Sequence, residues 1–183
     1  MIRAVSRTKD DLIDLLKLSG GFVSAMDGLW FLTVEEAFGN AEAVKLDMKV
    51  REKYTHVLVK RLKRQLNLSG SGIEMIAQII EMDPSFLTND YEISYLSKDR
   101  MFLRVNRCTV LEAMERCGRK EFMCEKSTGS YFRNIAREIK AEVCVHAIKL
   151  PPRNSSDEVC CEWLFEARPP FSANKSAEKN TER

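Results

Sequence analysis

The spacing of apolar residues changes at Asp83-Pro84, and this change restricts the folds open to the chain. Before this point apolar residues recur at the helical period, most clearly between residues 40 and 66. After it, short segments rich in aromatic and β-branched residues are separated by turn-forming and helical segments. We therefore predict an α+β protein, with helices in its N-terminal half and strands and helices in its C-terminal half.

Four helices are predicted before Pro84. They cover residues 8–18, 28–38, 40–66 and 73–82. Gly20-Gly21 is expected to break the first, and Asp27 is a suitable N-cap for the second. Ser71 with Glu74 has the spacing of a capping box for the fourth.

Two hairpins with two helices between them are predicted after Pro84. The expected strands are 91–96, 101–107, 142–150 and 159–167, and the expected helices are 109–118 and 127–140. Thr109 with Glu112 repeats the capping-box spacing at the first of these helices. This order favours a small antiparallel sheet covered by helices. Residues 169–183 are polar and predict a disordered tail, which leaves 1–168 as a single domain.

The charge balance and the hydropathy of the sequence argue against nucleic acids and membranes as binding partners. With 29 basic and 27 acidic residues the net charge is only +2, so the chain has no overall field that attracts nucleic acid or anionic membranes. Residues 1–10 lack the apolar stretch of a signal peptide, and no apolar run approaches the length of a membrane span. We expect a cytoplasmic protein that binds neither nucleic acid nor membranes, with six reduced cysteines.

Strand alternation sorts the cysteines of the C-terminal half. Cys161 should face inward with Trp163, whereas Cys160 should lie on the opposite face. Cys144 and His146 are two residues apart on one strand and therefore project to the same side. Cys117 continues the apolar face of a helix and is interpreted as a core thiol.

These positions support the hypothesis of a metal site. Its candidate ligands are Cys108, Cys124, Cys144 and Cys161, with His146 as a substitute. Thiolates are the preferred ligands of zinc and of iron–sulfur clusters, so either is the expected cofactor if the thiols converge. No pair has the Cys-x-x-Cys spacing, and two alternatives remain open: a reactive or ligand-contacting thiol, and thiols that only pack in the core.

Two acidic residues and several aromatic residues are further candidates. Glu35 and Asp47 fall among apolar residues of two helices, where a carboxylate serves acid–base chemistry or is paired structurally. Arg51 lies four residues after Asp47, the spacing of an intrahelical ion pair. The remaining candidates, which line a small-molecule pocket or pack in the core, are Trp30, Tyr131 and Trp163.

Several short motifs carry a resemblance to known families. They are Asp27–Leu32 with Glu35 and Asp47, Arg107-Cys108, Phe122-Met123-Cys124, Tyr131-Phe132, Cys144, Pro151-Pro152, and Cys161–Phe165. This set resembles a prokaryotic family of unknown function related to the L-2-amino-thiazoline-4-carboxylic acid hydrolase-like proteins. The order of elements is also similar to the ligand-binding fold of 4-vinyl-reductase-type domains, shared with nitric-oxide-signalling and Golgi-transport domains. The resemblance implies a ligand-binding or hydrolase-like scaffold and fixes no reaction.

Three functions follow from these observations. The first is a binding module for a small molecule or metal ion, favoured because the chain contains no nucleophile elbow, P-loop, dinucleotide fingerprint or His-Glu-x-x-His motif. The alternative is a hydrolase of a cyclic amidine or thiazoline-like molecule, with Cys144 or Cys161 as nucleophile or metal ligand and His146, Glu35 or Asp47 carrying protons. A third is an assembly protein that forms a homodimer through the helix 40–66.

Overall fold

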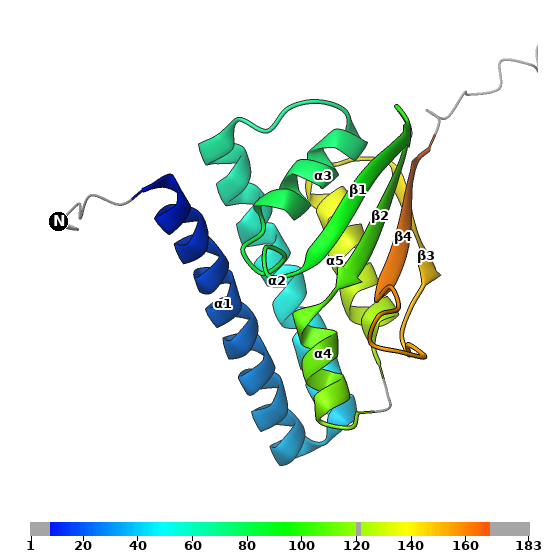
Figure 1. Cartoon of the computed structure of the whole chain (residues 1–183). Helices are drawn as coiled ribbons and strands as arrows, with labels where there is room; N and C mark the ends of the chain where they lie inside the picture. Colours follow the sequence, from blue (N-terminus) through cyan, green and yellow to red (C-terminus); the bar gives the residue numbers. More distant parts are fainter. Residues whose placement is uncertain (1–7, 120–121, 169–183) are drawn as a thin grey trace, which may run out of the picture.

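The computed structural model describes residues 8–119 and 122–168, and it places a sheet on one side of a set of helices (Figure 1). Its elements are α1 (Lys9–Phe38), α2 (Asn40–Leu66), α3 (Gly72–Met82), β1 (Asp90–Ser97), β2 (Arg100–Arg107), α4 (Thr109–Arg116), α5 (Cys124–Glu138), β3 (Val143–Lys149) and β4 (Cys161–Ala167). The predicted α+β class is confirmed. The predicted tail, 169–183, lies outside the described residues, and the single domain ending at 168 stays a prediction.

The sheet joins the two hairpins through their second strands. Its order is β1-β2-β4-β3, and every neighbouring pair is antiparallel. Residues directly opposite each other in such a pair share a face of the sheet. The pairs Met101↔Phe165 and Leu103↔Trp163 therefore belong to one face, and all four side chains are fully buried there.

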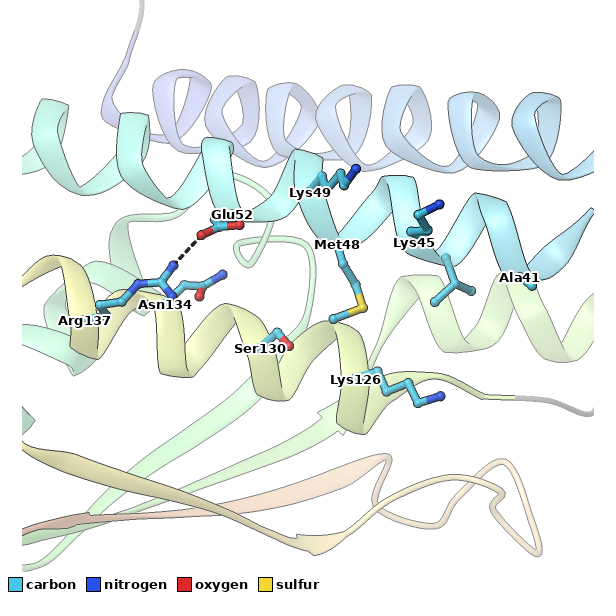
Figure 2. Close-up of a pocket in the computed structure, with 10 residues that line it drawn as sticks. Ala41, Lys45, Met48, Lys49, Glu52, Lys126, Ser130, Asn134 and Arg137 are labelled. Atoms are coloured by element: carbon cyan, nitrogen blue, oxygen red, sulfur yellow. Dashed lines mark hydrogen bonds and ion pairs between the residues drawn. The ribbon is translucent and has the colours of Figure 1, made fainter. Parts of the chain in front are cut away.

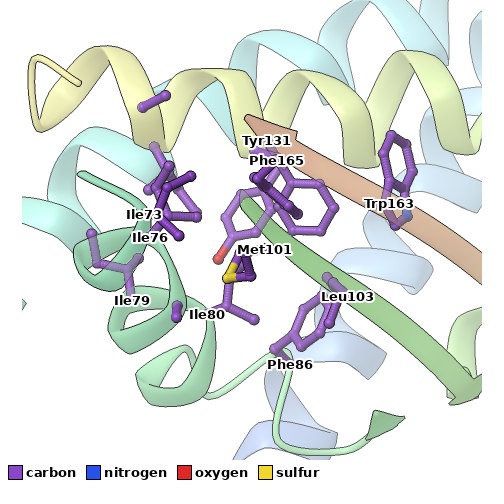
Figure 3. Packing of buried hydrophobic residues seen from close by; sticks show 14 of the residues in the cluster. Ile73, Ile76, Ile79, Ile80, Phe86, Met101, Leu103, Tyr131, Trp163 and Phe165 are labelled. Carbon is purple, nitrogen blue, oxygen red and sulfur yellow. The ribbon is translucent and has the colours of Figure 1, made fainter. Parts of the chain in front are cut away.

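Helices α3 and α5 cover this inner face (Figure 3). Phe132 of α5 lies at the centre of the core, with its ring centroid 5.2 Å from those of Trp163 and Phe165 in edge-to-face geometry. Helix α3 adds an apolar face of isoleucines that includes Ile76 and Ile80, both without exposed surface. Behind α5 lies α2, and α1 packs on α2 at the edge of the molecule.

Helix α1 is continuous, so the predicted break at Gly20-Gly21 and the predicted N-cap at Asp27 are both wrong. A glycine inside a helix destabilises it by only about 1 kcal/mol and does not stop it. Gly20 is needed for a close approach, because a Cβ there would lie 2.1 Å from the carbonyl oxygen of Pro84. In the part of the chain that the structure describes, no helix is both long enough and apolar enough to cross a membrane.

One predicted capping box forms and the other does not. Ser71 and Glu74 cap α3 reciprocally, with the Ser71 N–H donating to the Glu74 carboxylate at 2.7 Å. At α4 the N-cap residue is Cys108, so the box predicted at Thr109 is wrong. Glu112, the second residue of that box, instead accepts a hydrogen bond from Arg107 Nε at 2.7 Å, because the preceding strand brings this guanidinium beside it.

Candidate functional site

Four cysteines gather at the end of the sheet where β2 stops and β4 starts. Cys108 follows β2 and caps α4, Cys124 is the first residue of α5, and Cys161 is the first residue of β4 with Cys160 directly before it. The pairing of β2 with β4 fixes two of them, because Cys161 lies opposite Val105 and the Cys160 N–H donates to the Val105 carbonyl oxygen at 2.9 Å. We refer to Cys108, Cys124, Cys160 and Cys161 as the cysteine cluster.

The thiols of the cysteine cluster are close enough to influence one another's ionisation. Burial, with the charges of Cys108 and Cys160, raises the pKa of Cys124 to about 11. Burial also raises the pKa of Cys161 to about 12; the nearby Trp163 N–H acts in the opposite direction and the other three thiols add to the rise. Both side chains are therefore neutral thiols at neutral pH.

Two sources of positive potential lie beside the cluster. Burial raises the pKa of both Cys108 and Cys160, and the charge of Arg153 partly offsets this rise. The side chain of Arg153 is only 4% exposed, and its guanidinium forms a bidentate ion pair with Glu115. Backbone N–H groups at the start of α4 also lower the pKa of Cys108, as expected at a helix N-terminus. Both features favour thiolates over thiols.

Cys144 and His146 lie on the outer face of the sheet, away from the cysteine cluster. Cys144 is opposite Glu166 and His146 is opposite Leu164, whereas the intervening Val145 is opposite the buried Phe165. The predicted ligand set is therefore divided by the sheet: Cys108, Cys124 and Cys161 are on one side, and Cys144 with His146 is on the other. In the described parts of the chain, no three His, Cys, Asp or Glu side chains are spaced to hold a metal ion.

Two further cysteine predictions are wrong. Cys160 was expected on the face opposite to the core, but it is 1% exposed because its thiol lies against β2 and donates to the Asn106 carbonyl oxygen at 3.3 Å. Cys117 was expected in the core and is exposed, because α4 ends at Arg116 and Cys117 is its C-cap.

Asp47 belongs to an ion-pair triad between α1 and α2. Arg51 donates from Nε to Asp47 at 2.8 Å and from a terminal nitrogen to Asp27 at 2.7 Å. The predicted spacing of Asp47 and Arg51 thus forms the intrahelical pair. Burial raises the pKa of Asp27, against the influence of Arg51. The Asp47 side chain is 7% exposed, and its Oδ1 has no hydrogen-bond partner among the described residues.

A second buried polar group is centred on Asp83, which has no exposed surface. Its carboxylate accepts hydrogen bonds from Tyr54 at 2.6 Å, from Tyr131 at 2.5 Å and from the backbone and side chain of Ser85. Burial, followed by the Asp83 charge, raises the pKa of both tyrosines. Tyr131 of α5 therefore stabilises the buried Asp83 carboxylate with a hydrogen bond. The charge of Arg51 slightly lowers the pKa of both Tyr131 and Cys124.

The remaining predicted residues do not meet in one pocket. Glu35 forms an ion pair with Arg119 and accepts a hydrogen bond from Asn40 at 2.6 Å. These contacts connect the C-terminal end of α1 to the start of α2 and to the segment after α4. These bonds lower the pKa of Glu35. Trp30 is 37% exposed on α1, and Trp163 is buried in the core beside Cys161.

A shallow groove of about 440 Å³ runs between α2 and α5 on the surface (Figure 2). Its apolar floor includes Met48, and its rim carries Lys49 and Lys126. Arg137 on the same rim donates to Glu52 at 2.8 Å. None of the sequence-predicted residues lines this groove, so it is separate from the cysteine cluster.

Three residues were missed in the sequence analysis: Asp83, Arg153 beside the cysteine cluster, and Cys160 within it. Neither Asp83 nor Arg153 was among the candidate residues. Cys160 was set aside because strand alternation was extended one residue too far, since β4 begins at Cys161. A signal for Arg153 was available in the adjacent Pro151-Pro152, which restricts the loop that presents it.

Residues 5–167 match the model of a family described as "Family of unknown function (DUF6125)". No curated protein and no solved structure gives a match. Nothing in these comparisons links the chain to the thiazoline hydrolase-like or 4-vinyl-reductase-type families that its motifs resemble.

Proposed function

This chain belongs to the DUF6125 family of unknown function, and from that premise we propose that it is a binding domain for a soft metal ion held by two thiols of the cysteine cluster, those of Cys124 and Cys161. The observation that carries the proposal is the convergence of four cysteines from three separate places in the chain on one end of the sheet. Sulfur donors select zinc, copper(I) and iron–sulfur clusters over hard cations.

The protonation of the cluster favours binding over cysteine catalysis. A thiol is a weak nucleophile unless it ionises, and thiols with a pKa of about 11 and about 12, those of Cys124 and Cys161, remain protonated near neutral pH. A metal ion removes this obstacle because it displaces the thiol proton when it binds. Binding of a metal ion therefore converts the buried neutral thiols into thiolates that coordinate it.

Arg153 and the N-terminus of α4 would stabilise the loaded site. Two thiolates around copper(I) leave a net negative centre inside a partly buried region, and nearby positive potential stabilises such a centre. Arg153 supplies a fixed charge whose effect already reaches Cys108 and Cys160. Cys108, Cys124 and Cys161 are each only half-buried, so an ion has access to three of the four residues.

The experiment is a titration of the reduced, metal-free chain with Cd²⁺ under anaerobic conditions. Sulfur-to-cadmium charge-transfer absorption reports thiolate ligation directly. We expect one equivalent per chain, with absorption that is strongly reduced in Cys124→Ser and in Cys161→Ser. Binding should release protons, which a weakly buffered titration measures.

Two matched controls are available within the same chain. Cys117→Ser removes an exposed thiol and Cys144→Ser removes a thiol on the other side of the sheet, so both should titrate as the wild type does. Circular dichroism checks that each variant is folded. A folded Cys124→Ser/Cys161→Ser variant that still gives the full signal would contradict the proposal.

A second candidate function, the hydrolase, rests on the outer face of the sheet. There Arg168 Nε donates to Cys144 Sγ at 3.0 Å, and His146 Nε2 lies 3.5 Å from Glu166 Oε2. Cys144, His146 and Glu166 would supply a nucleophile, a base and an orienting carboxylate for a cyclic amidine or thiazoline-like substrate. Iodoacetamide should then modify Cys144 at least about tenfold faster than the exposed Cys117. Equal rates would eliminate this candidate.

A further inference from the structure

The outward face of α1 carries an unbroken apolar surface. In Figure 1 this helix lies at the edge of the molecule with α2 on its inner side. Along the opposite side, residues alternate at spacings of three and four: Leu15, Leu18, Phe22, Ala25, Leu29 and Leu32. All six are exposed, and the five large side chains are between 49% and 65% exposed. This spacing is the a and d pattern of a coiled-coil seam.

No charged residue interrupts this seam. Between Leu18 and Val34 the sequence contains one charged residue, Asp27. Asp27 points inward, since it accepts a hydrogen bond from Arg51 of α2 at 2.7 Å. A solvated helix face normally carries charged side chains, so the outer face of α1 has the composition of a buried surface.

The exposed area of the seam is large enough for a specific interface. The five large side chains of the seam are 49% to 65% exposed. At roughly 100 Å² each they present about 500 Å² per chain, at the upper end of the largest apolar patch of a typical monomer, and a symmetric pair would bury about 1,000 Å² in total, which reaches the lower limit for a specific interface.

We propose that α1 forms an antiparallel homodimer through this seam, with a twofold axis between residues 23 and 24. A symmetric pair requires the seam to be complementary to itself. About this axis, Leu15 meets the partner's Leu32 and Leu18 meets the partner's Leu29. This dimer differs from the one expected through the helix 40–66, and it does not depend on the proposed metal site.

The two central positions select the antiparallel orientation. Phe22 meets the partner's Ala25, so that each large side chain packs beside a small one and volume is conserved across the seam. A parallel pair would instead stack the two Phe22 rings in one layer and leave the two Ala25 methyl groups facing each other in the next. Gly21 and Gly28 flank the seam, and a Cβ at either would have no described atom within 4 Å, so the partner helix can approach closely there.

Sedimentation equilibrium of the full chain tests the association. We expect a wild-type dimer at micromolar concentration, and Leu29→Asp should weaken the dimerisation constant at least about 100-fold because each dimer would bury two unpaired carboxylates. The matched control is Ile148→Asp, which changes a 54% exposed apolar residue of β3, outside α1, and should leave the dimer unchanged. Neither position belongs to the buried core, so both variants should fold.

Disulfide trapping tests the orientation in a Cys117→Ser background. Leu15→Cys with Leu32→Cys should give covalent dimers on oxidation, whereas Leu15→Cys alone should give none. Trapping by Leu15→Cys alone would overturn the antiparallel orientation. A wild-type chain that stays monomeric at 100 μM would overturn the dimer, and so would a monomer that binds phosphatidylglycerol vesicles through α1, because that result would identify a lipid surface as the occupant.

Discussion

The adjacent glycines of α1 should respond in opposite directions to the same substitution. A Cβ on Gly20 would lie 2.1 Å from the carbonyl oxygen of Pro84, whereas a Cβ on Gly21 would have no described atom within 4 Å. Both positions are inside a continuous helix, where alanine is more favourable than glycine by about 1 kcal/mol. The comparison therefore isolates the contact between α1 and the segment after α3.

The size of the difference follows from how firmly Pro84 is held. Its neighbour Asp83 accepts hydrogen bonds from the backbone N–H groups of Ser85 and Phe86, each at 2.9 Å, so the carbonyl oxygen cannot move aside freely. Forcing a methyl group into such a position destabilises a protein by about 1–3 kcal/mol. After the helix gain, Gly20→Ala should lower the free energy of unfolding by up to about 2 kcal/mol, and Gly21→Ala should raise it by about 0.5–1 kcal/mol.

Urea denaturation of the two variants at equal protein concentration, followed by circular dichroism, measures the difference. Gly21 flanks the dimer seam, so both substitutions are compared in the Leu29→Asp background, in which the dimer is weakened. The reasoning would be refuted if Gly20→Ala were as stable as Gly21→Ala, since α1 would then not approach Pro84 as closely as described.

Three further outcomes follow from the buried groups and the thiols. Tyr131→Phe removes one donor from the buried Asp83 carboxylate and should lower the free energy of unfolding in urea by about 1.5–3 kcal/mol, whereas the exposed Tyr95→Phe should change it by less than about 0.5 kcal/mol. The pKa of Glu35 is lowered on folding, so its contribution is present above its unfolded value of 4.5 and is lost as the pH falls; unfolding of Glu35→Gln should depend less on pH between about 5 and 3. The affinity for Cd²⁺ should rise about tenfold per pH unit for each thiol that is deprotonated on binding, and a pH-independent affinity would exclude thiolate ligation.

The strands and most helices could be predicted because their signals are local. The alternation in residues 101–107 and 161–165 specifies one buried face, and the structure buries Met101, Leu103, Trp163 and Phe165 on it. The capping box of Ser71 and Glu74 is likewise contained in four residues. A local signal is sufficient where no other element competes for the same groups; the box predicted at Thr109 and Glu112 failed because Arg107 of β2 binds the Glu112 carboxylate.

The errors arise where a distant contact decides the outcome. Nothing near Gly20 in the sequence reveals that Pro84, 64 residues later, will lie against it, and so a helix was divided in two. Similarly, Cys144 was grouped with Cys108, Cys124 and Cys161, because alternation gives the side of a residue only relative to its own strand. The pairing of β3 with β4 decides which side that is.

Substitution of Asp47 can distinguish a structural role of this residue from a role in ligand binding. Its Oδ2 accepts a hydrogen bond from Arg51, while the buried Oδ1 has no partner among the described residues. Arg51 also holds Asp27, so Asp47→Asn keeps an acceptor for Arg51 and removes one of two negative charges around a single guanidinium. We expect a loss of no more than about 1–2 kcal/mol in the free energy of unfolding and an unchanged affinity for Cd²⁺. Arg51→Met, which leaves both carboxylates without a cation, should instead cost about 3–5 kcal/mol. If Asp47→Asn keeps its stability but binds Cd²⁺ at least about tenfold more weakly, the unpartnered oxygen serves the ligand and the structural interpretation of Asp47 is wrong.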